Sequence, residues 1–350
     1  MIDVFINIDY TLSAKYGIND PVQHIDREKA HALLNEPSIY AEQAVKCSGG
    51  GAANVAKIAA MLGIKTSFSG CIGNDDLAAL FEKEITDAGA SVILTKTNER
   101  TGICFVCTSG GETIIAASPG AALTLDETLI SDELIGGAEA IALDGYILDR
   151  RSLVQHILRL ASRRGIPVAL DAASVFQVRS KAEEILTYSR SFPLIIFMNA
   201  DESLAFYNTI RKNSTVKPVN AAAAKVTRDE YSNLSDREKE TIILQDVCPM
   251  LKIITDGEIY PIIVVKLGGR GAVVVAGGNI YREDTYTIIP RSTVGAGDAF
   301  CAAFLAAWIR GKSLSECAVL GNKVAREILE VPGTQIKSGK LKSFTKMLAK

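Results

Sequence analysis

The sequence predicts an α/β protein built around a mostly parallel sheet. Apolar runs rich in β-branched residues alternate with segments whose apolar residues recur at helical spacing, which is the pattern of βαβ units. The segments expected as strands are residues 66–72, 138–143, 167–171, 194–198, 262–266, 272–276 and 285–289. The segments expected as helices are residues 53–62, 76–88, 152–164 and 201–211, followed by two that start at Gly295 and near Ser315.

Composition limits the classes of function. Of the 350 residues, 48% are hydrophobic and 22% charged, which is enough apolar material for a large core. A net charge of −2 argues against a nucleic-acid partner, which needs clustered basic side chains. The seven cysteines are odd in number and mostly lie in apolar segments, as reduced cysteines of cytoplasmic proteins do. No apolar run approaches the roughly 20 residues of a membrane span, so we expect a cytoplasmic protein without a membrane partner.

We expect residues 1–350 to form a single domain with additions. Residues 8–48 and 98–118 depart from the βαβ rhythm, because short strand-like runs alternate there with turns. These segments are expected to form a small β lid. Residues 212–258 are first polar and then helical, with Pro218 and Pro249 within them, and are expected to be a surface insertion.

Residues 292–308, STVGAGDAFCAAFLAAW, carry the strongest functional signal. Gly295 and Gly297 leave the turn before a helix without side chains, so its N–H groups can approach an anion closely. The helix dipole adds partial positive charge at the same place, which suits phosphate. Asp298 needs a separate reason, because an acid beside a polyphosphate is unfavourable.

Phosphoryl transfer supplies such a reason for Asp298. The attacking hydroxyl must lose its proton, and a carboxylate within hydrogen-bond reach can accept it. The alternative is that Asp298 only stabilises the first turn of the helix, where acids are common. A dinucleotide-binding G-x-G-x-x-G motif is excluded, because Phe300 stands where its third glycine would be.

Two further segments are candidates for binding. Ser48-Gly49-Gly50-Gly51 opens a helix whose first turn contains Asn54, an amide that can donate to and accept from hydroxyls. Asn199-Ala200-Asp201-Glu202 follows a strand directly and could hold Mg²⁺ through water, or could simply cap the next helix.

The three motifs GGGAANVA, NADE and TVGAGDAF, in this order and spacing, resemble the ribokinase/PfkB carbohydrate kinase family across nearly the whole chain. The segments SFSGCIGNDD and VVKLGGRGAVVV resemble the same family, and residues 2–36 look most like its adenosine kinase branch. The resemblance implies a ribokinase-like three-layer α/β/α sandwich with a mostly parallel central sheet and a small β lid. It also implies ATP and Mg²⁺ as cofactors, and a monomer or homodimer.

The resemblance implies roles for individual residues. Asp298 would be the catalytic base, and Gly295, Ala296 and Gly297 would form an anion hole. Asp3, Gly50 and Asn54 would hold the sugar. The residues that would serve the nucleotide and its magnesium ion are Asn199, Glu202, Gly268, Gly271 and Asn322, with Glu202 contacting the metal through water.

Three departures from the family pattern matter. The strand residues expected before Asp3 are missing, so the chain is expected to begin late or to have an incomplete first strand. Ser292 stands where the family commonly has Asp at a monovalent cation site, so potassium activation is not implied here. Gly111-Glu112-Thr113 stand where many relatives have a lid arginine, so an anionic acceptor is not favoured.

The hypothesis from the sequence is therefore ATP-dependent transfer of a phosphoryl group to a hydroxymethyl group of a sugar or ribonucleoside. The alternative is a nucleotide- or nucleoside-binding protein of the same fold with weakened catalysis. The partners expected are small molecules.

Overall fold

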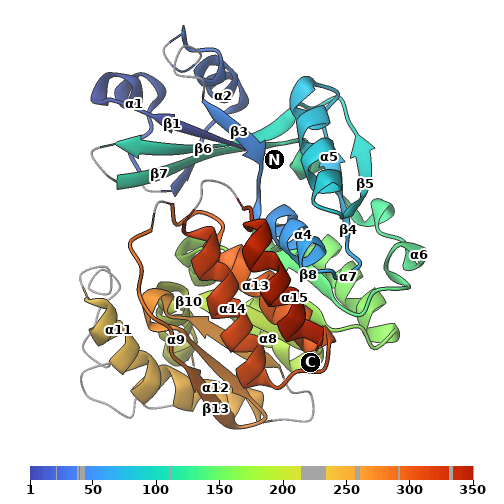
Figure 1. The fold of residues 1–350 in the computed structure, drawn as a ribbon, viewed down its shortest axis with the longest axis vertical. Helices are drawn as coiled ribbons and strands as arrows, with labels where there is room; N and C mark the ends of the chain where they lie inside the picture. Colours follow the sequence, from blue (N-terminus) through green and yellow to red (C-terminus); the bar gives the residue numbers. More distant parts are fainter. Residues whose placement is uncertain are drawn as a thin grey trace. The chain divides into compact units, whose positions relative to one another are not determined.

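The computed structural model describes residues 1–20, 22–37, 39, 44–109, 112–213, 234–256, 261–290, 292–330 and 334–349. The chain divides into two compact units, Met1–Leu125 (unit 1) and Asp126–Lys350 (unit 2). Figure 1 shows the helices and strands of both units.

Unit 1 contains a five-stranded sheet in the order β2-β7-β6-β1-β3 and a separate parallel pair, β4 and β5. β6 and β7 form an antiparallel hairpin, and β1 lies parallel to β6 and antiparallel to β3. The elements are β1 (Ile2–Asn7), α1 (Tyr10–Tyr16), β2 (Val22–His24), α2 (Arg27–Leu34), β3 (Val45–Ser48), α4 (Gly51–Met61), β4 (Ser67–Ile72), α5 (Asp76–Asp87), β5 (Ser91–Lys96), β6 (Thr101–Ser109), β7 (Glu112–Gly120) and the 3₁₀ turn η1 (Ala121–Thr124).

The two segments predicted as a β lid both contribute to the five-stranded sheet of unit 1, residues 98–118 through the β6–β7 hairpin. Residues 8–48 differ from the expectation of strands and turns, because they also contain the helices α1 and α2. Asp9 and Asp26 cap these helices by accepting hydrogen bonds from the backbone N–H groups of Leu12 and Lys29. Gly111, which the lid interpretation used, lies outside the described residues.

Unit 2 is built on a six-stranded sheet in the order β13-β12-β11-β10-β9-β8. The strands from β8 to β11 are parallel, and β12 and β13 add two antiparallel strands at one edge. Its elements up to β10 are η2 (Glu127–Leu129), α6 (Asp132–Ile135), β8 (Ile141–Asp144), η3 (Gly145–Asp149), α7 (Arg151–Arg163), β9 (Val168–Asp171), α8 (Val175–Ser191) and β10 (Leu194–Asn199). The remaining elements are α9 (Ala200–Asn213), α11 (Asp236–Ile242), η5 (Ile243–Val247), α12 (Cys248–Thr255), β11 (Ile262–Lys266), η6 (Gly268–Arg270), β12 (Ala272–Ala276), β13 (Asn279–Glu283), α13 (Ala296–Ile309), α14 (Leu314–Ile328) and α15 (Ser338–Ala349).

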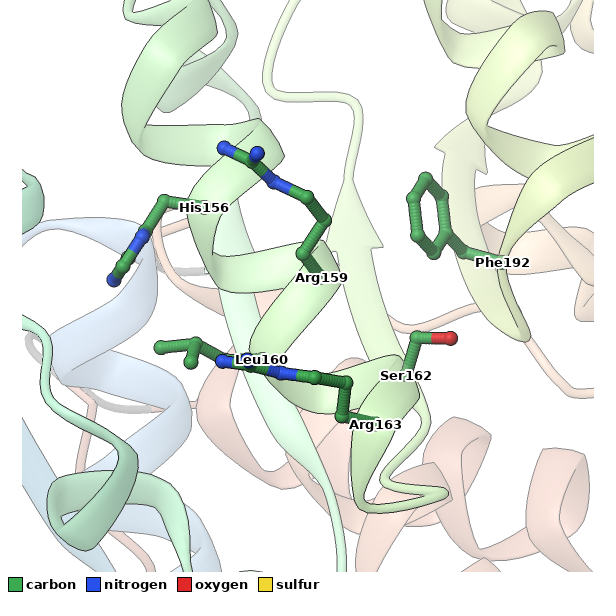
Figure 2. Close-up of a pocket in the computed structure, with 6 residues that line it drawn as sticks. All are labelled: His156, Arg159, Leu160, Ser162, Arg163 and Phe192. Atoms are coloured by element: carbon green, nitrogen blue, oxygen red, sulfur yellow. The ribbon is translucent and has the colours of Figure 1, made fainter.

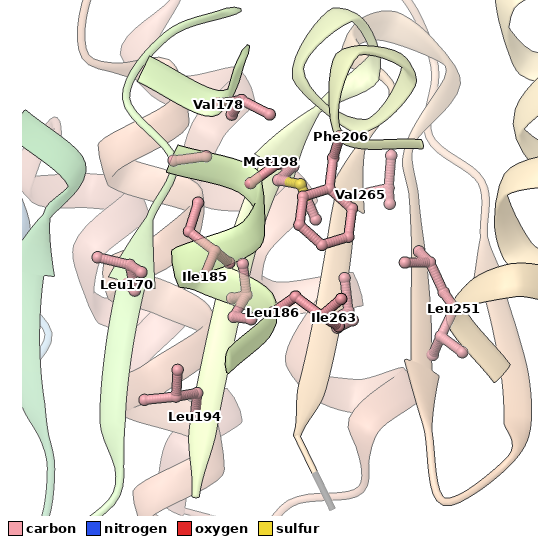
Figure 3. Packing of buried hydrophobic residues seen from close by; sticks show 14 of the residues in the cluster. Leu170, Val178, Ile185, Leu186, Leu194, Met198, Phe206, Leu251, Ile263 and Val265 are labelled. Atoms are coloured by element: carbon pink, nitrogen blue, oxygen red, sulfur yellow. The ribbon is translucent and has the colours of Figure 1, made fainter. Parts of the chain in front are cut away.

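The central strands of unit 2 are apolar on both faces, because helices cover each side. One set of alternating side chains packs against α7, α8, α9 and α12, and Figure 3 shows part of this cluster. The strand residues in it include Leu170, Met198, Ile263 and Val265. On the other face Phe197 packs edge-on against Phe304 of α13, with the ring centres 5.4 Å apart.

The described part of the predicted insertion, residues 234–256, forms a helix that covers the sheet of unit 2. α11, η5 and α12 follow one another without a break, and η5 is a π-helical turn. Pro249 is the second residue after this turn, and its missing N–H accounts for a local departure from α-helical bonding. Val247 and Leu251 are fully buried in the core, so this part of the chain belongs to the body of unit 2. Pro218 lies outside the described residues.

One predicted strand is wrong. Residues 285–289 have no regular secondary structure, and the edge strand β13 is formed instead by Asn279–Glu283. Tyr286 and Ile289 are 65% and 96% exposed, so the apolar residues that predicted a strand do not pack into the sheet. Pro290 follows directly and cannot donate to a neighbouring strand.

A capping box formed by Ser313 and Glu316 lies at the start of α14. The Ser313 hydroxyl accepts from the Glu316 N–H, and the Glu316 carboxylate accepts from the Ser313 N–H at 2.9 Å. Among the helices of the described ranges, none has the length and apolarity needed to cross a bilayer.

Candidate active site

The α13 helix begins with a turn that suits an anion. Gly295 adopts a left-handed conformation with φ of 81°, which glycine reaches without the strain of a side chain. The Ala296 N–H donates to the Thr293 carbonyl oxygen at 3.4 Å. No side chain among the described residues caps this helix start, so the positive end of the helix dipole is available to a ligand. Asp298 lies in the first turn and is partly exposed.

Three polar side chains lie at the carboxyl ends of neighbouring parallel strands. Asp171 ends β9, Asn199 ends β10 and Lys266 ends β11. The strand register pairs Phe197 with Asp171 and Asn199 with Lys266. Because side chains alternate between the two faces of a sheet, these three residues share the face on which Phe197 packs against α13. The carboxyl ends of parallel strands are where α/β proteins bind ligands.

Lys266 and Asp171 form a buried ion pair at this edge. The Lys266 Nζ lies 2.6 Å from the Asp171 Oδ2, and the same oxygen accepts from the Cys301 thiol at 3.3 Å. Burial alone would lower the pKa of Lys266, but the charge of Asp171 raises it well above the ordinary value. Burial alone would raise the pKa of Asp171, but Lys266 lowers it on balance. Both groups are therefore charged near neutral pH.

Asn199 and Glu202 bond reciprocally at the start of α9. The Glu202 carboxylate accepts from the Asn199 backbone N–H at 2.7 Å and from its side-chain amide at 2.8 Å, while the Asn199 Oδ1 accepts from the Glu202 N–H at 2.8 Å. The capping alternative for this motif is thus present in the structure. Burial, reinforced by the charge of Asp171, raises the pKa of Glu202 to about 7.

The carboxylates at this edge suit an Mg²⁺ ion that is bound through water. They suit less well an ion that several protein side chains coordinate directly. Within the described ranges no three His, Cys, Asp or Glu side chains form a direct metal site. Mg²⁺ usually keeps several waters and takes one or two carboxylates together with substrate phosphates. Asp171 and Glu202 could hold such an ion through water, and its charge would favour the ionised form of Glu202.

The turn η6 lies between β11 and β12 and contains the predicted nucleotide residues Gly268 and Gly271. A Cβ at Gly271 would lie 2.0 Å from the Glu283 carbonyl oxygen, so the turn admits no side chain there. Arg270, between the two glycines, is paired with Glu240 of α11. Glu240 also pairs with Arg282 of β13 at 2.6 Å, so one buried carboxylate ties α11 to both the turn and the edge strand.

Glu240 gives a prediction of pH-dependent stability. Burial alone would raise its pKa, but Arg282 and Arg270 lower it on balance below the ordinary 4.5. A lowered carboxyl pKa stabilises the fold above about pH 4.5, and this stability is lost as the pH falls through the folded-state pKa. We expect Glu240→Gln to cost about 1–3 kcal/mol in free energy of unfolding near pH 7, because hydrogen bonds to a charged group are lost.

The difference in free energy of unfolding between Glu240→Gln and the parent chain should shrink as the pH is lowered toward about 4. Urea unfolding at several pH values measures it. Glu238→Gln is a control on the exposed face of the same helix, where the carboxylate serves only the capping box with Ser235. A Glu240→Gln difference that stays constant with pH would contradict the assigned ion pairs.

Asn322 lies on α14, where the sequence predicted a residue flanking the nucleotide. It is buried, and its side-chain amide donates to the Glu283 carbonyl oxygen at 3.3 Å. One donor of this amide therefore holds α14 to the end of β13.

Unit 1 brings Asp3 together with the glycine-rich turn that precedes α4. Asp3 is buried in β1, and a Cβ at Gly49 would lie 1.9 Å from its Cγ, so the carboxylate occupies the space a side chain would need. Gly50 is the residue before α4, and Asn54, also buried, lies in the first turn of that helix. The Lys57 ammonium donates to the Ser48 carbonyl oxygen at 2.7 Å and supports the same turn.

A separate pocket lies in unit 2, and Figure 2 shows its lining. Its volume is about 380 Å³, and it is lined by His156, Arg159, Leu160, Ser162, Arg163 and Phe192. These residues lie near the end of α7 and just before β10, at the amino ends of β9 and β10. The pocket therefore lies at the edge opposite to the strand ends that carry Asp171, Asn199 and Lys266.

The sequence interpretation did not single out Asp171, Lys266 or Cys301, and it included Gly49 only as part of the glycine-rich segment. Asp171 and Lys266 each end an apolar strand that the sequence predicted correctly, and a charged residue at that point was the available signal. Cys301 lies one helical turn after Asp298 in an apolar segment, and the sequence therefore indicated a core residue.

Comparison with known proteins agrees with this architecture. The chain is 25% identical over 355 residues to an adenosine kinase of Schizophyllum commune, covering 96% of this chain and 94% of the relative. It is 27% identical over 325 residues to a ribokinase of Arabidopsis thaliana, covering 89% and 74%.

The solved adenosine kinase of Sinorhizobium meliloti superposes with a TM-score of 0.77 at 23% identity, covering 99% of this chain and 96% of that structure. The ribokinase-like fold predicted from the sequence is thereby confirmed. The family model for pfkB family carbohydrate kinases matches residues 11–227 and 219–340. The chain belongs to the pfkB family of carbohydrate kinases.

Proposed function

We propose that the protein transfers the γ-phosphoryl group of ATP to a hydroxymethyl group of a sugar or ribonucleoside. The observation that carries the proposal is the start of α13, where a glycine turn without a side-chain cap adjoins Asp298. Similarity to an adenosine kinase along 96% of the chain favours a ribonucleoside among the acceptors.

The proposed reaction begins with the acceptor hydroxyl, whose proton passes to the Asp298 carboxylate. The hydroxyl oxygen forms a bond to the γ-phosphorus as the bond to the β–γ bridging oxygen breaks, and ADP leaves with that electron pair. The backbone N–H groups at Gly295, Ala296 and Gly297 stabilise the negative charge of the transferred group. Mg²⁺, when bound, neutralises phosphate charge, and Glu202 contacts it through water.

The other proposed roles are those that the family resemblance implies. In unit 2, Asn199, Gly268, Gly271 and Asn322 border the nucleotide. In unit 1, Asp3, Gly50 and Asn54 bind hydroxyl groups of the acceptor; Asp3 and the turn at Gly50 are adjacent, which supports this assignment.

A panel assay tests the function. We expect at least one primary-hydroxyl sugar or nucleoside to stimulate ADP release from ATP above the rate seen with water alone. A coupled assay of ADP formation over ribose, fructose, adenosine and other nucleosides measures this. The alternative is a binding protein with weakened catalysis. That alternative gains if ATP or a nucleoside binds in calorimetry while no panel member stimulates ADP formation.

A further inference from the structure

Lys266 has no role in the function proposed so far, yet its buried ion pair with Asp171 is costly to build. Two charges are removed from water, and apolar side chains of similar size stabilise a fold as well as or better than a buried ion pair. The Lys266 side chain is only 14% exposed, and the Asp171 side chain 23%. Stability alone therefore does not account for the pair.

The Lys266 ammonium lies close to the turn that begins α13. A Cβ at Gly297 would lie 3.3 Å from the Lys266 Nζ, so the ammonium lies beside the first turn of α13. Cations are stabilised at helix C-termini, whereas this one adjoins the positive end of a helix dipole. Burial lowers the pKa of Lys266, but the charges of Asp171 and Glu202 raise it on balance above the ordinary value, so the protein itself stabilises the ammonium. The ammonium and the first turn of α13 nevertheless lie side by side, and together they suit an anion.

Gly297 places the backbone of the α13 turn close to the Lys266 ammonium. Its φ is not positive, unlike that of Gly295, so the backbone conformation does not require glycine there. A Cβ there would approach the Lys266 ammonium to 3.3 Å, so the backbone of the turn and the ammonium are close neighbours.

We propose that Lys266 is a further residue of the phosphate site, which stabilises the charge of the transferred phosphoryl group from beside the α13 turn. Asp171 and Cys301 are positioning residues that hold its ammonium at 2.6 Å and 3.8 Å. The ligand class is the terminal phosphate of a nucleoside triphosphate. This inference rests on the proposed function and names a further charge within the same site.

The test compares Lys266→Met with the double variant Lys266→Met/Asp171→Asn. The single variant leaves the Asp171 carboxylate without its partner and can fail to fold for that reason, whereas the double variant removes both charges. The matched control is Lys181→Met/Asp149→Asn, which removes a 3.2 Å ion pair elsewhere in unit 2. Turnover is measured with the best acceptor of the panel. Calorimetry gives the affinity for ADP and for the non-hydrolysable ATP analogue AMP-PNP, and circular dichroism monitors folding.

We expect the double variant to fold and to lose about 10²–10³-fold in turnover, as when one preorganised donor to a developing charge is removed. Its affinity for AMP-PNP should fall at least about 10-fold relative to that for ADP, because only the triphosphate analogue has the terminal group. The control pair should change neither quantity.

Near-normal turnover with an unchanged AMP-PNP to ADP ratio overturns the proposal. Equal weakening of both nucleotides also overturns it, because the charge would then act away from the terminal phosphate. If the parent chain releases no ADP with any acceptor, the proposed function fails. The calorimetric ratio still decides the role of Lys266 in that case.

Discussion

Replacing Asp298 by Asn is expected to lower turnover by about 10²–10⁴-fold while ATP remains bound. The amide has nearly the shape of the carboxylate, so the α13 turn should keep its geometry, but it cannot accept the hydroxyl proton. Removing a negative charge beside the phosphates should leave ATP affinity unchanged or tighter. Steady-state kinetics with the best acceptor and calorimetry with ATP measure the two effects separately.

The competing explanation for Asp298 is that it only stabilises the start of α13. In that case Asn would cost about 0.3–1 kcal/mol of stability through the helix dipole, and turnover would not change. Glu316→Gln is the matched control, because Glu316 is the acid in the first turn of the neighbouring helix α14 and serves a capping box. Asp298→Asn with near-normal turnover would remove Asp298 from the role of base.

The elements that the sequence predicted well are those with strong local signals. The glycine turn at 295–297 predicted a helix start free of side chains, and α13 begins there. Ile262–Lys266 and Ala272–Ala276 form strands over the bounds expected, because continuous β-branched runs suit strands covered on both faces.

Residues 285–289 show where local pattern fails. Their alternation is typical of a strand, but pairing needs a neighbour with free backbone groups, and Asn279–Glu283 already pairs with β12 at this edge. Tertiary context decides between the two segments, and it is not visible in a window of five residues.

The contact between Asp171 and Lys266 could not be predicted from the sequence. Asp171 and Lys266 are separated by 95 residues, and their contact depends on the order β9-β10-β11 and on a register that places both side chains on one face. The sequence gives each strand and the charge at its end. Pairing order and register come from the packed sheet, so the ion pair and its proximity to Gly297 emerge only in the structure.

Substitution of Gly49 is expected to have a large effect on acceptor binding in unit 1. We expect Gly49→Ala to lower kcat/KM for the acceptor by about 10–100-fold, the equivalent of losing one hydrogen bond to a charged group. The new Cβ would lie 1.9 Å from the Asp3 Cγ, so the carboxylate must move from the place where we propose that it binds a hydroxyl. Overpacking of this kind should also cost about 1–3 kcal/mol in free energy of unfolding.

Two variants separate the effect on the acceptor from the effect on stability. Gly137→Ala is the matched control, because a Cβ there meets no atom within 4 Å and its φ is not positive. Asp3→Asn keeps the packing against Gly49 and removes only the charge, so it should raise KM for the acceptor with a smaller loss of stability. If Gly49→Ala folds and binds the acceptor as the parent chain does, then Asp3 does not hold the substrate. The shared contact of Asp3 and the turn would in that case be one of packing, and Asn54 would remain as the polar group of unit 1 to test.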